Sequence, residues 1–204
     1  MADKHSDLAW DLIFDATDNG SPLFNTQDTK NDFNKACDHI QVLVEDAFSC
    51  YTRGSYGTSV FLSITAIEET AKAEIGLYRR NNKDIKKKKR KDPLFDHLTK
   101  HRMAILPTVF MGRRLVDVIG EARCQALRKE VASGSLKELR EKALYFYNSN
   151  GRLLSPKDVI TRNKAKEIIL LAVETIDDRL VGYTGHTGII EMRLNQIFAD
   201  VSSS

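Results

Sequence analysis

Residues 60–78, VFLSITAIEETAKAEIGLY, decide the fold of this 204-residue chain. At 3.6 residues per turn, the apolar side chains of this segment fall on two sides of one helix. One apolar stripe runs through Val60, Ile64, Ile67, Ala71, Ile75 and Tyr78, and the other through Leu62, Ala66, Ala73 and Leu77. A helix that is apolar on two sides is usually buried, so the segment predicts a helix packed among neighbouring helices.

A charged triad, Glu68, Glu69 and Lys72, lies between the two stripes. Lys72 is roughly 40° from Glu68 and roughly 60° from Glu69 around the helix, so both carboxylates can reach its ammonium group. Because the flanks are apolar, we expect a partly desolvated triad with a role in catalysis or recognition. Two plainer interpretations stay open: an exposed stabilising pair, and a structural cross-link inside the core.

The rest of the chain also favours helices. Only 4 prolines and 11 glycines interrupt it, and helical periodicity recurs where strand alternation does not. The expected helices cover 8–14 (a short helix or an arm), 26–53, 55–82, one opened by Asp92-Pro93, 108–132, one opened at Ser135, one from Ser155 to about 180, and 187–201. We therefore predict an all-α, up-and-down helical bundle.

Composition indicates a globular protein of one domain, 1–204, with 42% hydrophobic and 29% charged residues. We divide it into an N-terminal arm or short helix (1–25), a core (26–182) and a C-terminal helix and tail (183–204). The three cysteines have no metal-like spacing, which favours reduced thiols. No signal-peptide pattern and no apolar run of membrane-spanning length is present, so we expect a cytoplasmic protein without a membrane partner.

His97 is the candidate general acid or base, because an ordinary histidine titrates near neutral pH. Lys100 and His101 lie on neighbouring positions of the same helical face. A histidine beside a cation is the minimal apparatus for RNA cleavage without a metal, since the histidine takes the 2′-hydroxyl proton and the cation stabilises the phosphate. The alternatives are a surface histidine, and a metal pair with His101. No third ligand accompanies that pair, so we predict no metal site and no cofactor.

A run of six basic residues precedes this histidine. It consists of Lys86, Lys87, Lys88, Lys89, Arg90 and Lys91. Such a run can contact RNA phosphates, each contact adding salt-sensitive affinity, although the usual fate of a charge run is a solvated loop. Tyr145, Phe146 and Tyr147 can stack on bases, or else belong to the core.

Four segments in this order resemble the AbiV-type abortive infection proteins, which belong to the HEPN group of small helical-bundle proteins. The segments are Ser63–Ala73, then Phe95 with His97 and Lys100, then Leu139–Tyr145, and finally Ser155–Ile160. Together they extend over roughly residues 30 to 180. The resemblance implies a HEPN-type bundle with additional N- and C-terminal helices. It also implies a cytoplasmic phage-defence protein that is dimeric and stops translation or growth on infection.

Many HEPN proteins are metal-independent ribonucleases that carry an arginine, a gap of four to six residues and a histidine, with the groove formed across a dimer. Arg90 and His97 have this spacing, with six residues between them. Glu68, Glu69, Lys72 and Lys100 are the positions that match the AbiV-like pattern itself. The resemblance therefore implies these six residues as the catalytic site.

Two functions remain in view. The leading hypothesis is an RNA-targeting toxin, a metal-independent endoribonuclease that works as a homodimer on host or phage RNA, with a phage-encoded protein as its trigger. The alternative is a non-catalytic helical module that binds a phage or host protein and blocks translation indirectly.

Overall fold

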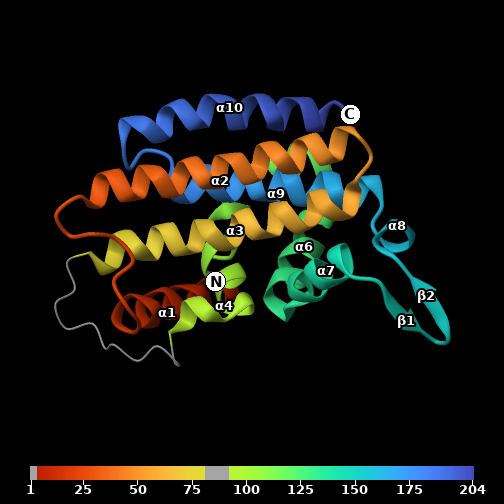
Figure 1. The fold of residues 1–204 in the computed structure, drawn as a ribbon, viewed down its shortest axis with the longest axis horizontal. Coiled ribbons are helices and arrows are strands. Elements are labelled where there is room, and N and C mark those ends of the chain that lie inside the picture. The colour runs from red at the N-terminus through yellow and green to blue at the C-terminus, as the bar shows by residue number, and fades with distance from the viewer. Residues whose placement is uncertain (1–3, 81–91) are drawn as a thin grey trace.

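The computed structural model describes residues 4–80 and 92–204, in which helices joined by loops make up the fold apart from one short hairpin (Figure 1). The first half holds α1 (Lys4–Asp18), α2 (Thr29–Thr52), α3 (Tyr56–Arg79), the 3-10 helix η2 (Pro93–Phe95) and α4 (His97–Ile105). The second half holds η3 (Val109–Met111), α5 (Arg114–Ile119), α6 (Glu121–Ser133), α7 (Ser135–Leu144), β1 (Tyr147–Ser149), β2 (Arg152–Leu154), α8 (Pro156–Val159), α9 (Arg162–Leu180) and α10 (Gly185–Ser202). The all-α class is confirmed.

The long helices α2, α3, α9 and α10 pack side by side, while α1, α4 and α7 cover the opposite side of α3 (Figure 1). The helix α3 is thus the only one of these to contact both groups extensively, which explains its two apolar stripes. Val60, Ile64 and Ile75 are fully buried from one stripe, and Ala66 from the other. The prediction of a buried helix is confirmed.

Glycine brings two neighbours unusually close to α3. A Cβ atom on Gly57 would lie 2.7 Å from the carbonyl oxygen of Ala143 and 2.7 Å from Cβ of Pro156. The first turn of α3 therefore meets the end of α7 and the start of α8 at backbone contact. This contact fixes the position of α7 relative to α3, which matters for the site described below.

Several of the sequence-based boundaries are wrong. The expected helix 108–132 is divided into η3, α5 and α6, with Gly120 at a φ of 82° between α5 and α6. The expected helix from Ser155 is divided into α8 and α9, because Thr161 caps α9 through Lys164. Residues 147–154, which lie between two expected helices, form the hairpin β1–β2.

Arg79, the last residue of α3, is joined to Asp92 by a buried bidentate ion pair. Its Nη1 and Nη2 atoms lie 2.9 and 2.8 Å from the two carboxylate oxygens. Nε of Arg79 donates to the carbonyl of Ala16 at 2.8 Å, and Asp92 accepts from the amide of Leu94 at 3.0 Å. The pair fastens α3, the end of α1 and the start of η2 to one another.

Candidate functional site

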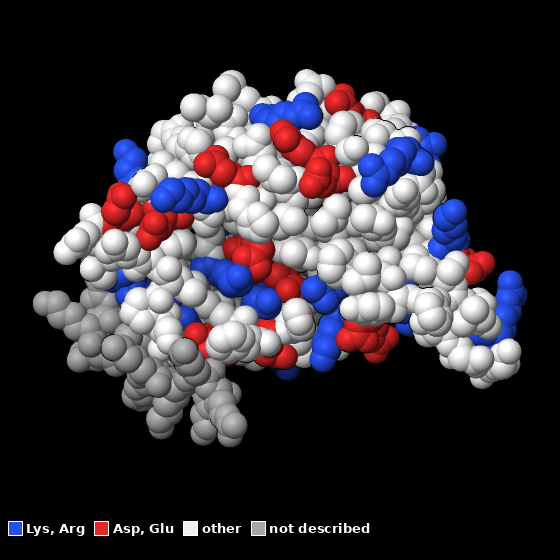
Figure 2. Space-filling view, in the orientation of Figure 1, with Lys and Arg blue, Asp and Glu red and all other residues white. Residues whose placement is uncertain are grey.

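Glu68 is the centre of a buried polar cluster where α3 meets α4 and α7. Its side chain is only 3% exposed, yet its carboxylate is surrounded by basic groups. Oε2 lies 2.8 Å from Nδ1 of His97 and 2.9 Å from Nζ of Lys100, and Oε1 lies 3.0 Å from Nε2 of His101. Figure 2 shows basic and acidic side chains gathered over α3 in this part of the molecule. One carboxylate thus organises three residues of α4.

The start of α4 delivers these residues to Glu68. The helix was expected to open at Asp92-Pro93, but Asp92 caps the short η2 instead. Asp96 caps α4, because its carboxylate accepts from the amide of Thr99 at 2.7 Å. The helix consequently begins at His97, and Lys100 and His101 follow three and four residues later on the same face. The prediction that the three residues share one face is confirmed.

Glu68 is ionised in this site. Burial by itself raises the pKa of the carboxyl group, but hydrogen bonds from His101 and Lys100 outweigh burial and lower the pKa to about 2. An ionised carboxylate can only accept hydrogen bonds. The ring nitrogens of His97 and His101 that face it must therefore carry protons, which fixes the tautomer of each ring when it is neutral.

The two histidines differ in their exposure and in whether a substrate can reach the ring. His97 donates through Nδ1 and keeps a lone pair on Nε2, and its side chain is 37% exposed, so a substrate can reach the ring. His101 is fully buried, and burial lowers its pKa, so that it is neutral at pH 7. Its Nδ1 has no hydrogen-bond partner within the described residues. His97 is therefore the reactive candidate, and His101 helps to hold Glu68.

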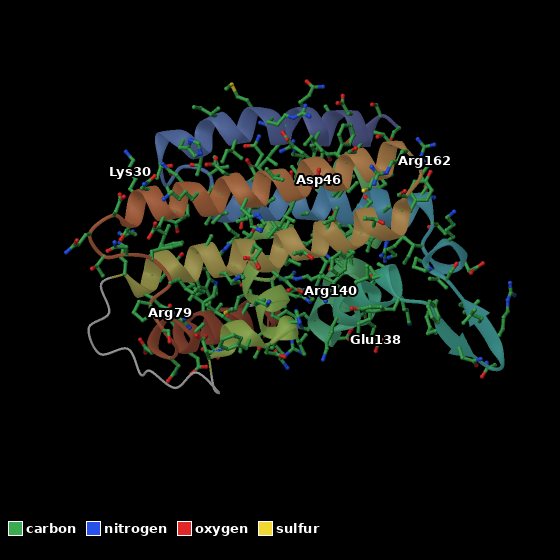
Figure 3. The ribbon with its side chains drawn as sticks, in the orientation of Figure 1. Lys30, Asp46, Arg79, Glu138, Arg140 and Arg162 are labelled. Carbon is green, nitrogen blue, oxygen red and sulfur yellow. The ribbon has the colours of Figure 1, made fainter. Side chains whose placement is uncertain are left out.

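Arg140, on α7, completes the cluster (Figure 3). Its Nε lies 3.4 Å from Oε1 of Glu68, and its guanidinium carbon lies 4.7 Å from the ring centroid of Phe61. The ring of Phe61 gives the guanidinium a favourable flat surface. At neutral pH, one carboxylate faces Lys100 and Arg140, which leaves the cluster with a net positive charge beside the exposed imidazole.

Arg140 was not among the site residues that we predicted from the sequence. The available signal was its place in Leu139–Tyr145, one of the four segments that carry the family resemblance. Lys100, in contrast, was predicted as a group that contacts substrate. Its buried ammonium binds Glu68 instead, so its observed part is to hold that carboxylate.

The triad on α3 is not a shared unit, which corrects our prediction. Lys72 binds Glu69 alone, with Nζ 2.6 Å from Oε2, and both side chains are partly exposed. Glu68 points away from Lys72 toward α4 and α7. Adjacent positions on a helix differ by about 100°, so Glu68 and Glu69 face different neighbours.

The basic run that we predicted to contact RNA is not part of the described chain. Lys86, Lys87, Lys88, Lys89, Arg90 and Lys91 lie outside the described residues. The described part of the chain contains no group of three His, Cys, Asp or Glu side chains arranged to hold a metal ion. His97 and His101, the metal pair considered above, both direct a ring nitrogen at Glu68.

Comparison with protein families gives one clear match. The family model of the AbiV proteins of the HEPN group matches residues 31–177. The chain belongs to the AbiV family. The matched range contains the whole Glu68 cluster, and AbiV membership indicates a broad role in abortive infection, a form of phage defence. Comparison with curated proteins and with solved structures found no match. Within the described ranges of this AbiV chain, no helix is long and apolar enough to cross a bilayer.

Proposed function

We propose that this AbiV protein is an RNA-targeting toxin of abortive infection, a metal-independent endoribonuclease that acts in the cytoplasm as a homodimer. One observation carries the proposal: the buried carboxylate of Glu68 binds Nδ1 of the exposed His97 at 2.8 Å. A carboxylate that orients an imidazole in this way leaves the other ring nitrogen ready to accept a proton, and it stabilises the imidazolium that results.

In the proposed reaction, Nε2 of His97 takes the proton of an RNA 2′-hydroxyl group. The 2′ oxygen then attacks the adjacent phosphorus, and the bond from phosphorus to the 5′ oxygen breaks. The 5′ oxygen takes a proton from solvent, which leaves a 2′,3′-cyclic phosphate and a 5′-hydroxyl end. The developing negative charge on the phosphate calls for a nearby cation.

Arg140 is the described cation best suited to that phosphate. It is half-buried, its Nε lies beside Glu68, and a guanidinium has five N–H donors, more than this one contact uses. Lys100 is buried and bound to Glu68, so it serves as a positioning residue. The basic residues 86–91 would add affinity for the RNA backbone, whereas Glu69 and Lys72 have no part in this chemistry.

The test compares His97→Ala with His39→Ala, which replaces an exposed histidine on α2, on the side of α3 that carries Glu69 and Lys72. Cells that express each variant at matched levels are infected, and phage resistance and RNA 5′ ends are measured. Loss of a general base lowers the rate by about 10²- to 10⁴-fold, so His97→Ala should abolish cleavage and protection. His39→Ala should behave as wild type, and chelators should have no effect on the purified protein.

The second candidate is a non-catalytic module that binds a phage or host protein. The burial of His101 and Lys100 favours it, because a polar cross-link between helices needs these contacts and no substrate. Full protection by His97→Ala, with unchanged RNA ends, would reject the ribonuclease and leave this candidate. A phage-encoded trigger is compatible with both.

A further inference from the structure

Residues 145–154, between α7 and α8, form what we call the arm. The strands β1 and β2 pair antiparallel within it, and Figure 1 shows the hairpin extending beyond the helices at one end of the bundle. Asn150 and Gly151 at the tip have φ angles of 52° and 80°, as a two-residue type I′ turn requires. The local sequence thus determines the hairpin, although the arm protrudes into solvent.

The arm carries large apolar side chains without cover. Phe146 is 72% exposed, Leu153 is 65% exposed and Tyr145 is 61% exposed. Large apolar side chains exposed on one projecting segment point to an interaction site. A two-stranded hairpin is also only marginally stable in water by itself. A partner seated on the arm would therefore stabilise it and bury these side chains together.

A cavity lies at the base of the arm, where the start of α3 meets α7 and α8. Its volume is about 500 Å³, and its apolar wall is formed by Tyr56, Ala143, Leu144, Pro156 and Ile160. Ser55, Thr58, Ser155 and Lys157 also line this cavity, so the chain presents an apolar projection beside a hollow of mixed polarity.

Charges at the two ends of the arm are opposite in sign. Arg152 is exposed near the tip, and Glu138 and Glu141 are exposed on α7 near the base. Figure 3 shows Glu138 on α7 close to the arm. Lys142 neutralises part of this charge, because its Nζ lies 3.8 Å from Glu138. Glu141 has no ion pair in the described part of the chain.

We infer that the arm is a dimerisation interface and that the partner it binds is a second copy of this chain. A two-fold axis perpendicular to the arms makes them antiparallel, so that the tip of each one meets the base of the other. Leu153 then reaches the cavity of the second copy, and Arg152 faces its Glu138 and Glu141. The charge complementarity is satisfied twice, as a self-complementary interface requires.

This inference rests on the homodimer of the proposed function and specifies its surface. It also brings the second copy to α7, the helix that carries Arg140. The helix that supplies the phosphate-binding cation would be held by the partner's arm.

A charge exchange tests the arrangement on the full chain. Arg152→Glu and the double variant Glu138→Arg with Glu141→Arg should each fail to dimerise, because like charges meet at both contacts. Their equimolar mixture should form a heterodimer, since each contact then pairs opposite charges. Sedimentation should give twice the 23.1 kDa chain mass for wild type and for the mixture. Wild-type affinity in both separate variants would overturn the inference, and so would a monomeric wild type.

Apolar variants locate the interface independently. Phe146→Ser with Leu153→Ser should weaken dimerisation at least about tenfold, with helicity and melting temperature close to wild type. The matched control is Ile189→Ser with Met192→Ser, two similarly exposed side chains on α10. If the control variant is monomeric and the arm variant still dimerises, the interface lies on α10 and the inference is overturned. An arm variant that loses phage protection from a protein that is always monomeric would point to a foreign partner.

The dimerisation test and the test of the ribonuclease proposal can fail independently of each other. His97→Ala should dimerise as wild type does, because His97 lies on α4 and its ring binds Glu68, so it belongs neither to the arm nor to the groups proposed to contact it. A dimer that follows the charge exchange but cuts no RNA would uphold the arm and reject the ribonuclease. RNA cleavage by a strictly monomeric chain would do the opposite.

Discussion

Glu68 and His97 belong to different helices, and the carboxylate of one accepts a hydrogen bond from Nδ1 of the other at 2.8 Å. The oxygen involved also binds Lys100, so the imidazole is held by a charge that cannot easily move. The neutral ring is thereby kept in one tautomer, with the lone pair on Nε2 at its exposed side. Three consequences for stability, acid sensitivity and catalysis can be measured directly, and two more follow from the packing around α3.

The two neighbouring glutamates should differ sharply in their effect on stability. Glu68→Gln strands the buried Lys100 without its counter-charge, and breaking a buried pair costs about 3–5 kcal/mol. Glu69→Gln removes only a partly exposed pair with Lys72, which should cost roughly 0.2–1 kcal/mol. Urea unfolding of both variants provides the measurement. Equal losses would contradict the separation of the two carboxylates.

Stability should fall in acid because of the same carboxylate. The pKa of Glu68 in the fold, about 2, lies below its ordinary value of 4.5, so the stabilisation is complete above 4.5 and disappears as the pH falls toward 2. The shift corresponds to a loss on the order of 3 kcal/mol. The lowered pKa of His101 acts in the same direction, because the unfolded chain takes up its proton first. Unfolding between pH 7 and pH 3 should show a flatter slope for Glu68→Gln than for wild type.

Arg140 should matter for catalysis more than for folding. Arg140→Ala removes the proposed phosphate donor, for which a loss of about 10²- to 10³-fold in the cleavage rate is expected. Arg140→Lys keeps the charge but loses the planar donor pair and the contact with Phe61, so it should recover activity only partly. The rate of RNA cleavage by purified protein measures both. A wild-type rate for Arg140→Ala would remove Arg140 from the mechanism.

The ion pair between Arg79 and Asp92 should be one of the largest single contributors to stability. Asp92→Asn leaves a guanidinium with 0% exposure beside an uncharged partner, at a cost of about 3 kcal/mol. Three backbone carbonyls also bind Arg79 and keep the loss from being larger. Arg80→Ala, which changes the adjacent exposed arginine, should stay within about 0.5 kcal/mol of wild type. Thermal melts compare the two.

Glycine substitutions should have opposite signs at two helical positions. Gly57→Ala places a methyl group 2.7 Å from the backbone of Ala143, and such overpacking costs about 1–3 kcal/mol. Gly188→Ala on α10 meets no atom within 4 Å, and alanine favours a helix over glycine by about 1 kcal/mol. Denaturant midpoints that move in the same direction for both would contradict the close contact between α3 and α7.

The sequence predicted the helices well wherever apolar periodicity was long. The two stripes of α3 identify it as a buried helix because each stripe has its own partners. Gly120 and the Ile160-Thr161 step break helices that periodicity alone would continue, since the cap of Thr161 and the positive φ of Gly120 are local backbone effects. The hairpin has three residues in each strand, too few for alternation to emerge. The division into N-terminal, core and C-terminal parts stays a prediction.

The candidate site was only partly predictable. His97, Lys100 and Glu68 could be selected from their types and spacing, but their connection spans 29 to 32 positions of the sequence. From the spacing on one helix we assigned Glu68 to Lys72. The donors that bind Glu68 in the structure come from another helix and are buried together with its carboxylate. Arg140 lies 72 positions from Glu68, beyond the range of any local pattern.

The ion pair between Arg79 and Asp92 has a consequence for how the family can diverge. It joins the two ends of the segment that contains the basic run, so the ends stay together whatever that segment's composition. The entropy of closing such a segment grows slowly, by about 0.6 kcal/mol for each doubling of its length. Lysines can therefore be gained, lost or inserted there without a large penalty to the bundle. Related chains that keep this ion pair can change the composition of this one segment while its two ends stay joined.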